Sequence, residues 1–166
     1  MDETTEYTQA FTALVKRHEK IIFSVSFFYA TADVPFEDLR QEILMSLYKG
    51  YSSFKGNSTE ATWVYRVSIN TCLFSLKRYT PRFRTVPIEE IHALNSGEDS
   101  DIEFRHKLQW LYNAIAGLNP MEKALIIMWL DELTYEEIAS NMGIPRNTVA
   151  SRLHRIKEKL SSKKEI

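Results

Sequence analysis

Residues Thr134–Leu160, TYEEIASNMGIPRNTVASRLHRIKEKL, contain two amphipathic segments separated by a glycine and a proline. The first begins with a capping box, in which the Thr134 hydroxyl accepts from the Glu137 amide and the Glu137 carboxylate reaches back. We therefore predict a short helix that ends at Gly143, where a left-handed backbone is usually needed. Pro145 can open a second helix. The apolar residues of that helix recur at helical spacing and are Val149, Leu153, Ile156 and Leu160.

Two helices joined by a glycine-containing turn form a helix-turn-helix, whose second helix can enter the major groove of DNA. Residues 145–164 hold seven basic residues and one acidic residue, a concentration typical of a phosphate-binding surface. The alternative is an ordinary amphipathic hairpin with a solvated basic tail. We predict that the DNA-binding residues of this segment are Arg146, Asn147, Thr148, Ser151, Arg152 and Arg155.

The composition of the 166-residue chain, with 44% hydrophobic residues and a net charge of −1, predicts a globular protein of one domain or two small ones. The single cysteine, Cys72, lies in an apolar helical run and is expected to be a buried small hydrophobic residue. Because it cannot form an internal disulfide, a reducing cytoplasm fits. The apolar run 21–30 is interrupted by Ser24 and Ser26 and is shorter than the roughly 20 residues of a membrane span, so we expect no membrane insertion.

Two amphipathic helices are predicted in the N-terminal part, over about 5–30 and 35–49. The second is expected to bury Phe36, Leu39, Ile43 and Leu47. Its other face carries two carboxylates and an amide beside a methionine, namely Asp38, Gln41, Glu42 and Met45. That face could dock a partner helix, although a merely solvated charged face has the same pattern.

Residues 48–58, YKGYSSFKGNS, interleave three aromatic residues with two lysines. Aromatic rings can stack on unpaired bases while lysines hold phosphates, although such rings are often core residues. A third helix is expected to open at Ser58 as its N-cap and to run to Arg78. Within it, the amide of Asn70 needs partners, and an internal partner is favoured over a base.

Charge divides the chain into two basic parts with an acidic stretch between them. Residues 49–87 hold seven basic residues and one acidic, whereas 88–103 hold six carboxylates and no lysine or arginine. With its prolines, glycine and polar residues, the stretch 80–100 indicates a linker. A helix carrying Phe104, Leu108, Leu111, Ile115 and Leu118 is expected to follow, and then another containing Leu125, Met128 and Trp129. We therefore predict an all-α protein of two small helical domains joined by a flexible acidic linker, the C-terminal one containing the helix-turn-helix.

Several of these segments together resemble an extracytoplasmic-function (ECF) sigma factor of the bacterial sigma-70 family. The resemblance covers nearly the whole chain and rests on the segments FEDLRQE (36–42), SFKGNS (53–58), TWVYRV (62–67), INT (69–71), LNPMEK (118–123), LTYEEIA (133–139) and GIPRNTVASRLHR (143–155). It implies a region 2 domain over 1–80, a linker over 81–100 and a region 4 domain over 101–166. It also implies a cytoplasmic protein that directs core RNA polymerase to promoters.

By this resemblance, the face formed by Asp38, Gln41, Glu42 and Met45 docks on core RNA polymerase. The residues implied in melting the minus-ten element and holding a flipped base are Phe54, Lys55, Arg66 and Asn70, while Trp63 is structural. The helix after Pro145 is implied to read the minus-thirty-five element. Ala150 departs from the family pattern, in which a basic residue is common at this position, so the promoter sequence cannot be carried over. The expected partners are core RNA polymerase, promoter DNA and an anti-sigma factor.

Two other classes of protein fit this sequence less well. A stand-alone helix-turn-helix regulator would share residues 118–160 but would not need the basic aromatic segment around Phe54. An enzyme is disfavoured, because the four histidines have no metal-ligand spacing, no glycine-rich phosphate loop occurs and no nucleophile has a neighbouring base. We therefore expect no catalytic residues, no metal and no cofactor.

Overall fold

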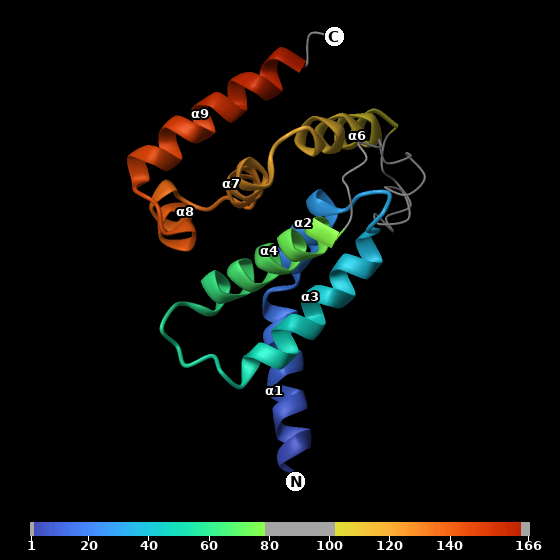
Figure 1. Cartoon of the computed structure of the whole chain (residues 1–166), viewed down its shortest axis with the longest axis vertical. Coiled ribbons are helices and arrows are strands. Elements are labelled where there is room, and N and C mark those ends of the chain that lie inside the picture. The colour runs from blue at the N-terminus through green and yellow to red at the C-terminus, as the bar shows by residue number, and fades with distance from the viewer. Residues whose placement is uncertain (1, 79–101, 164–166) are drawn as a thin grey trace.

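The computed structural model describes residues 2–78 and 102–163, and within these ranges it consists of helices, turns and connecting segments without strands (Figure 1). The predicted all-α class is thus confirmed. The predicted linker lies outside the described residues. The helices are α1 (Glu3–Arg17), α2 (Glu19–Tyr29), α3 (Phe36–Tyr51), α4 (Glu60–Arg78), α6 (Ile102–Ala116), α7 (Pro120–Leu130), α8 (Tyr135–Met142) and α9 (Arg146–Lys163).

The single helix expected over 5–30 is in fact two helices, because the chain bends at His18. The His18 amide closes α1 by donating to the carbonyls of Leu14 and Val15, and its own carbonyl accepts from the first turn of α2. The His18 ring lies 3.0 Å from the Glu60 carboxylate, which also pairs with Arg17 at 3.1 Å. This cluster fastens the bend to the start of α4.

Helices α2, α3 and α4 pack together, and α1 extends away from them toward the N-terminus (Figure 1). The predicted buried face of α3 is confirmed for Leu39, Ile43 and Leu47, while Phe36 is only partly buried. Helix α4 begins one residue later than predicted. Its first turn is capped by Thr59, whose hydroxyl accepts from the Thr62 amide at 3.1 Å.

Cys72 lies fully buried on the inner face of α4, as predicted. Burial raises the pKa of its thiol far above the ordinary value, and the Glu42 carboxylate adds to the effect. The thiol is therefore a packing group that resists ionisation and reacts slowly.

In the C-terminal part, α7 begins with a capping box in which Asn119 accepts from the Glu122 amide at 2.9 Å. Ile115 and Leu118, two of the apolar residues of the predicted helical pattern, are buried. Phe104 lies on the predicted helix but is 51% exposed near the start of α6. The helical periodicity continues through Phe104, but α6 reaches its packing partners only further along its length.

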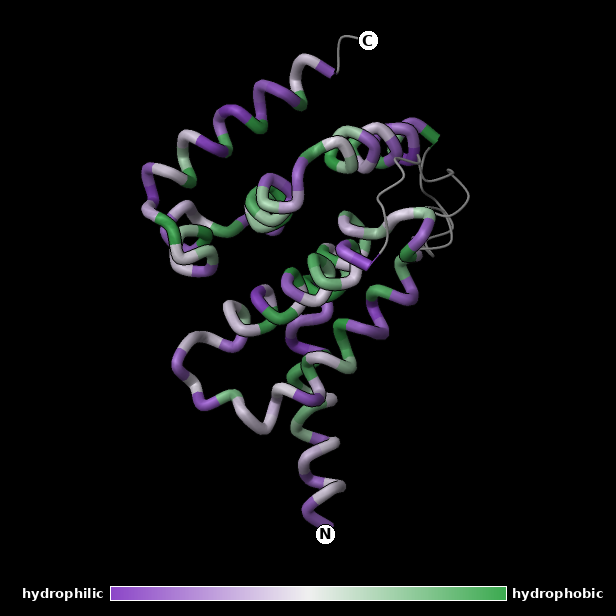
Figure 2. The backbone as a smooth tube through the Cα atoms, in the orientation of Figure 1, coloured by the Kyte–Doolittle hydropathy of each residue, from purple (hydrophilic) through white to green (hydrophobic). Residues whose placement is uncertain are grey.

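The two helical groups, α1–α4 and α6–α9, pack against each other through α2 with α6 and α7, and through α4 with α8. Most of their buried apolar residues form one cluster that spans both groups, and Phe27 and Tyr112 form a second, smaller one; the apolar stretches gather where the helices meet (Figure 2). Two tyrosine hydroxyls cross the contact: Tyr29 donates to the Pro120 carbonyl at 2.6 Å, and Tyr112 donates to the Ala30 carbonyl at 2.5 Å. Among the described helices, none has the length and apolar character needed to cross a membrane.

Candidate nucleic-acid interface

Helices α8 and α9 form the predicted helix-turn-helix. The capping box is present at the start of α8, where the Thr134 amide donates to the Glu137 carboxylate at 2.7 Å and the Glu137 amide donates back to the Thr134 hydroxyl at 3.2 Å. Gly143 ends α8 with φ 66°, the left-handed conformation that favours glycine. The four apolar residues predicted along α9 are all buried, which fixes the opposite face of that helix toward solvent.

That outward face carries the predicted DNA-binding residues near the start of α9. Arg146, Asn147, Ser151, Arg152 and Arg155 are exposed, and Thr148 is half-buried. Arg146 is oriented by a 2.5 Å ion pair with Glu136, which lowers the pKa of that carboxyl. The Ser151 hydroxyl donates to the Asn147 carbonyl one turn back at 2.8 Å. The structure thus places these six residues, exposed or half-buried, within the first ten residues of α9.

The lysines further along α9 contact other helices of the protein. The Lys157 ammonium lies 4.2 Å from the centre of the Trp129 ring, the Lys159 ammonium pairs with Glu122 at 2.6 Å, and the Lys163 ammonium donates to the Ala114 carbonyl at 3.5 Å. These contacts tie α9 to α6 and α7. Part of the basic charge counted in the sequence therefore holds the fold together.

The aromatic segment between α3 and α4 is anchored by Trp63. The Phe54 ring stacks on the Trp63 indole with centroids 5.0 Å apart and an angle of 29° between the ring planes. Gly50 permits this packing, because a Cβ there would come within 3.3 Å of the indole. Lys55 is exposed next to the half-buried Phe54. The rings therefore form a partly open stack rather than a closed core.

Arg66 and Asn70 lie one turn apart on the exposed side of α4. Asn70 faces outward, so the prediction of an internal partner for its amide is wrong. Arg66 reaches the other helical group: its Nε donates to the Asn141 carbonyl and its Nη2 to the Ser140 carbonyl, each at 3.0 Å. Beside them, a mostly apolar pocket of about 540 Å³ lies between α4 and the C-terminal group, lined among others by Asn70 and Met142.

Asp131, at the end of α7, is a further polar residue of this contact. Its carboxylate accepts from the Tyr65 hydroxyl at 2.7 Å and from the Ser24 hydroxyl at 2.9 Å. Burial raises the pKa of the Asp131 carboxyl, and the two hydrogen bonds oppose that effect. No periodicity or motif in the sequence marked Asp131, because its partners come from α2 and α4, which are distant in the chain.

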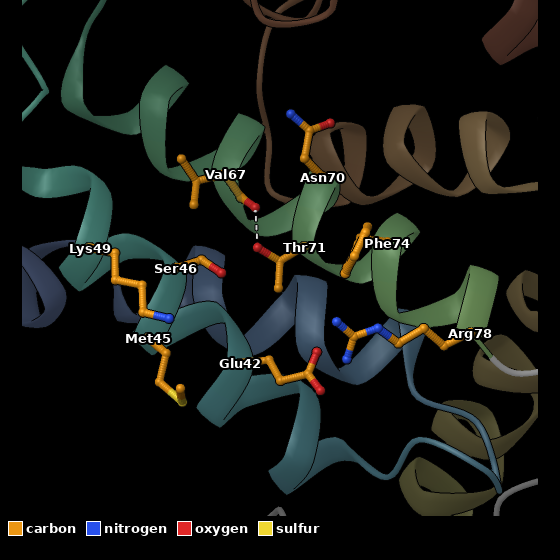
Figure 3. Close-up of a pocket in the computed structure, with 9 residues that line it drawn as sticks. All are labelled: Glu42, Met45, Ser46, Lys49, Val67, Asn70, Thr71, Phe74 and Arg78. Atoms are coloured by element: carbon orange, nitrogen blue, oxygen red, sulfur yellow. Dashed lines mark hydrogen bonds between the residues drawn. The ribbon is translucent and has the colours of Figure 1, made fainter.

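The face of α3 predicted to dock a partner is largely accessible. Asp38, Gln41 and Met45 are exposed, and Met45 is 57% exposed. Glu42 is half-buried and accepts a hydrogen bond from Ser75 of α4. Figure 3 shows Glu42 and Met45 at the α3 side of a groove that α4 closes on its other side.

Comparison with known proteins shows that both parts of the chain match models of one protein family. Residues 14–82 match Sigma-70 region 2, and residues 108–160 match Sigma-70 region 4. The ECF RNA polymerase sigma-E factor of Escherichia coli K12 is 32% identical, with 93% of this chain and 86% of the relative covered, and that of Haemophilus influenzae is 30% identical, with 93% and 87% covered.

Two solved structures share the fold, each with a TM-score of 0.66 and 18% identity. One is CnrH in complex with the cytosolic domain of CnrY, with 93% of this chain and 87% of that chain covered. The other is the sigma factor RpoE in complex with the anti-sigma factor NepR from Bartonella quintana, with 97% and 98% covered.

The chain therefore belongs to the sigma-70 family. Within it the chain is an ECF sigma factor, a subunit that directs RNA polymerase to promoters and initiates transcription. A stand-alone helix-turn-helix regulator is excluded, because the match includes region 2 and spans nearly the whole chain.

Proposed function

We propose that the two helical groups read two separate promoter elements. The N-terminal half of α9 contacts duplex DNA at the minus-thirty-five element through Arg146, Asn147, Thr148, Ser151, Arg152 and Arg155. Residues Phe54, Lys55, Arg66 and Asn70 hold an unpaired base of the minus-ten element. The observation that carries the proposal is that the members of both sets are exposed or half-buried, with the first set within the first ten residues of α9 and Arg66 and Asn70 one turn apart on α4.

Under this proposal, binding energy opens the promoter and no ATP-driven helicase is needed. Core polymerase contacts the DNA backbone, which positions the complex but carries no sequence information. Side chains of α9 can form bidentate bonds to base edges in the major groove. Capture of a flipped base against Phe54 stabilises the strand-separated form, so melting follows from binding alone. No catalytic residue, metal or cofactor takes part.

The same reading assigns α3 to the polymerase, through Asp38, Gln41, Glu42 and Met45. It divides the chain into a region 2 domain over 1–80, a linker over 81–100 and a region 4 domain over 101–166, and it places the protein in the cytoplasm with the polymerase. We also include control by an anti-sigma factor. The support for this is that both similar structures were solved as complexes, one with the cytosolic domain of CnrY and the other with the anti-sigma factor NepR.

The test is transcription by purified core RNA polymerase on genomic DNA fragments, with and without the chain, followed by mapping of transcript starts. We expect discrete new starts that share two spaced upstream motifs. Polymerase binding without new starts would refute promoter reading. Tight duplex binding by the chain, without any binding to core, would refute the assignment of α3 to the polymerase.

A matched pair of variants separates polymerase binding from folding. Asp38→Arg reverses an exposed charge on α3 and should weaken core binding while the helix content is unchanged. Glu6→Arg makes the same reversal on α1, outside the proposed interface, and should bind core as the wild type does. Equal core affinity for both variants would remove α3 from the interface.

A further inference from the structure

The exposed side of α4 continues beyond the two residues already assigned to DNA. In the structure, the exposed residues of this helix after its first turn are Arg66, Asn70, Phe74, Lys77 and Arg78. Their spacing of four, four, three and one places them along one side of the helix. Asn70 and Phe74 are neighbours on that side, about 6 Å apart along the axis. Phe74 therefore lies next to a residue that the proposed function places on an unpaired base.

Phe74 is exposed to an unusual degree for an aromatic residue. At 59%, it is the most exposed aromatic side chain in the described part of the chain. A single exposed hydrophobic side chain is common on protein surfaces, so exposure alone does not indicate a site. Here the Arg78 guanidinium lies 4.6 Å from the centre of the Phe74 ring, a cation–π arrangement that joins positive charge to an aromatic surface.

The ring and the guanidinium border a groove of about 610 Å³ between α3 and α4. Figure 3 shows Asn70, Phe74 and Arg78 projecting from successive turns of α4, with Lys49 across the groove on α3. Glu42, the acidic residue of the lining, already accepts a hydrogen bond from Ser75. The remaining charged groups of the lining, Lys49 and Arg78, are positive. Because Glu42 and Met45 on the α3 side belong to the face proposed for the polymerase, the α4 side of the groove is the part that suits an anionic ligand with flat rings.

We propose that Phe74 and Arg78 form a second stacking position for the displaced DNA strand, next to the base held at Asn70. Phe74 stacks on a base and Arg78 contacts its phosphate. This inference rests on the proposed function. A charged groove with an exposed ring is the combination that binds single strands without strict sequence readout, and its position continues the proposed minus-ten surface.

The experiment uses the full chain bound to core polymerase. The probe is a fluorescein-labelled oligonucleotide that carries the non-template strand of a mapped minus-ten region. Phe74→Ala should weaken its binding roughly 5- to 100-fold, and Phe74→Trp should retain it, because a larger ring restores stacking. Phe104→Ala, which truncates an exposed phenylalanine on α6, is the matched control and should leave binding unchanged. Arg78→Gln should lower the salt dependence of binding by about one unit of slope.

Core affinity and binding to minus-thirty-five duplex are measured for each variant. Unchanged strand affinity in Phe74→Ala would overturn the inference and leave the proposed function standing. Loss of core affinity in Phe74→Ala, with strand affinity intact, would assign the groove to the polymerase and also overturn it. If the wild-type complex fails to bind the strand, the proposed function fails as well.

Discussion

Arg66 and Asn141 are joined across the contact between the two helical groups, since the Arg66 Nε donates to the backbone carbonyl of Asn141 at 3.0 Å. A second nitrogen of the same guanidinium donates to the Ser140 carbonyl. Arg66 is also one of the residues we place at the minus-ten element. The contact uses two of the five N–H donors of the guanidinium and holds Arg66 against α8, so we expect DNA contact by Arg66 to require that α8 moves away from α4.

We therefore expect the two helical groups to separate when the promoter is bound. Cysteines introduced at Glu37 and Ser161, both exposed, can carry a donor and acceptor dye pair, because the native Cys72 is buried and its raised thiol pKa slows labelling. Energy transfer should fall when core polymerase and promoter DNA are added. Constant energy transfer in an open complex that needs Arg66 would contradict this expectation.

Removal of the Tyr65 hydroxyl should weaken the contact at Asp131. Tyr65→Phe deletes one of the two hydroxyl donors to a half-buried carboxylate, and we expect the free energy of unfolding to fall by about 1–3 kcal/mol, as measured by urea denaturation. Tyr7→Phe is the control. It removes a bond to the Tyr48 carbonyl at an exposed position, where water can replace the lost donor. Equal losses of unfolding free energy for both variants would show that the bond from Tyr65 to the Asp131 carboxylate contributes no more than an exposed hydrogen bond.

The half-buried Asp131 carboxyl also predicts a pH dependence of stability. Because burial raises the pKa of this carboxyl above its ordinary value of 3.8, the folded form binds the proton more tightly than the unfolded form does. Its contribution to stability is fully present below the ordinary pKa and is lost as the pH rises through the raised value. Glu60 acts in the opposite sense, because hydrogen bonds from His18 and Arg17 lower its pKa.

Asp131→Asn isolates the effect of Asp131. We expect the stability of the wild type relative to this variant to increase as the pH falls from about 7 to about 4, when unfolding free energies of the two proteins are compared at each pH. Lys20 is the nearby cation that opposes the shift and is present in both proteins. A difference independent of pH would mean that Asp131 keeps its ordinary pKa in the folded chain.

Arg155→Ala should lower the affinity for minus-thirty-five duplex by about 1–3 kcal/mol, if Arg155 makes a bidentate contact with a base. Lys159→Ala removes a positive charge from the same helix, but Lys159 pairs with Glu122, so we expect its loss to act mainly on folding. The two variants are compared by footprinting and by measuring their affinity for the mapped promoter. An unchanged footprint for Arg155→Ala would remove the base contact from Arg155.

Local chemistry made part of this structure predictable. The capping box at Thr134, the turn at Gly143 and the apolar spacing from Val149 onward are signals that act within a few residues, and all three are confirmed. The resemblance found on short motifs was likewise confirmed by the family match. The roles given to individual residues at the interfaces stay predictions.

What the sequence did not reveal depends on distant partners. The bend at His18 involves a single residue, so the helical spacing of the apolar residues continues across it. Glu60, whose carboxylate holds the His18 ring in place, is 42 positions away in the sequence. The outward position of Asn70 follows from how α4 packs on α2 and α3, which its apolar neighbours in the chain do not specify. The same holds for Asp131, whose importance lies in the contact between the two helical groups.

The lysines at the far end of α9 bear on how strongly salt should act on the helix-turn-helix. The logarithm of affinity falls with the logarithm of salt concentration by about 0.9 for each phosphate neutralised, as counterions are released. The seven basic residues of the segment would give a slope of roughly −6 if all neutralised phosphates. Lys157, Lys159 and Lys163 contact the protein itself, and Arg146 pairs with Glu136. Arg152 and Arg155 remain, together with Lys164, which lies outside the described residues, so the slope for this helix should be roughly −2 to −3. Duplex recognition by this sigma factor should therefore tolerate changes in ionic strength better than its basic C-terminal sequence suggests.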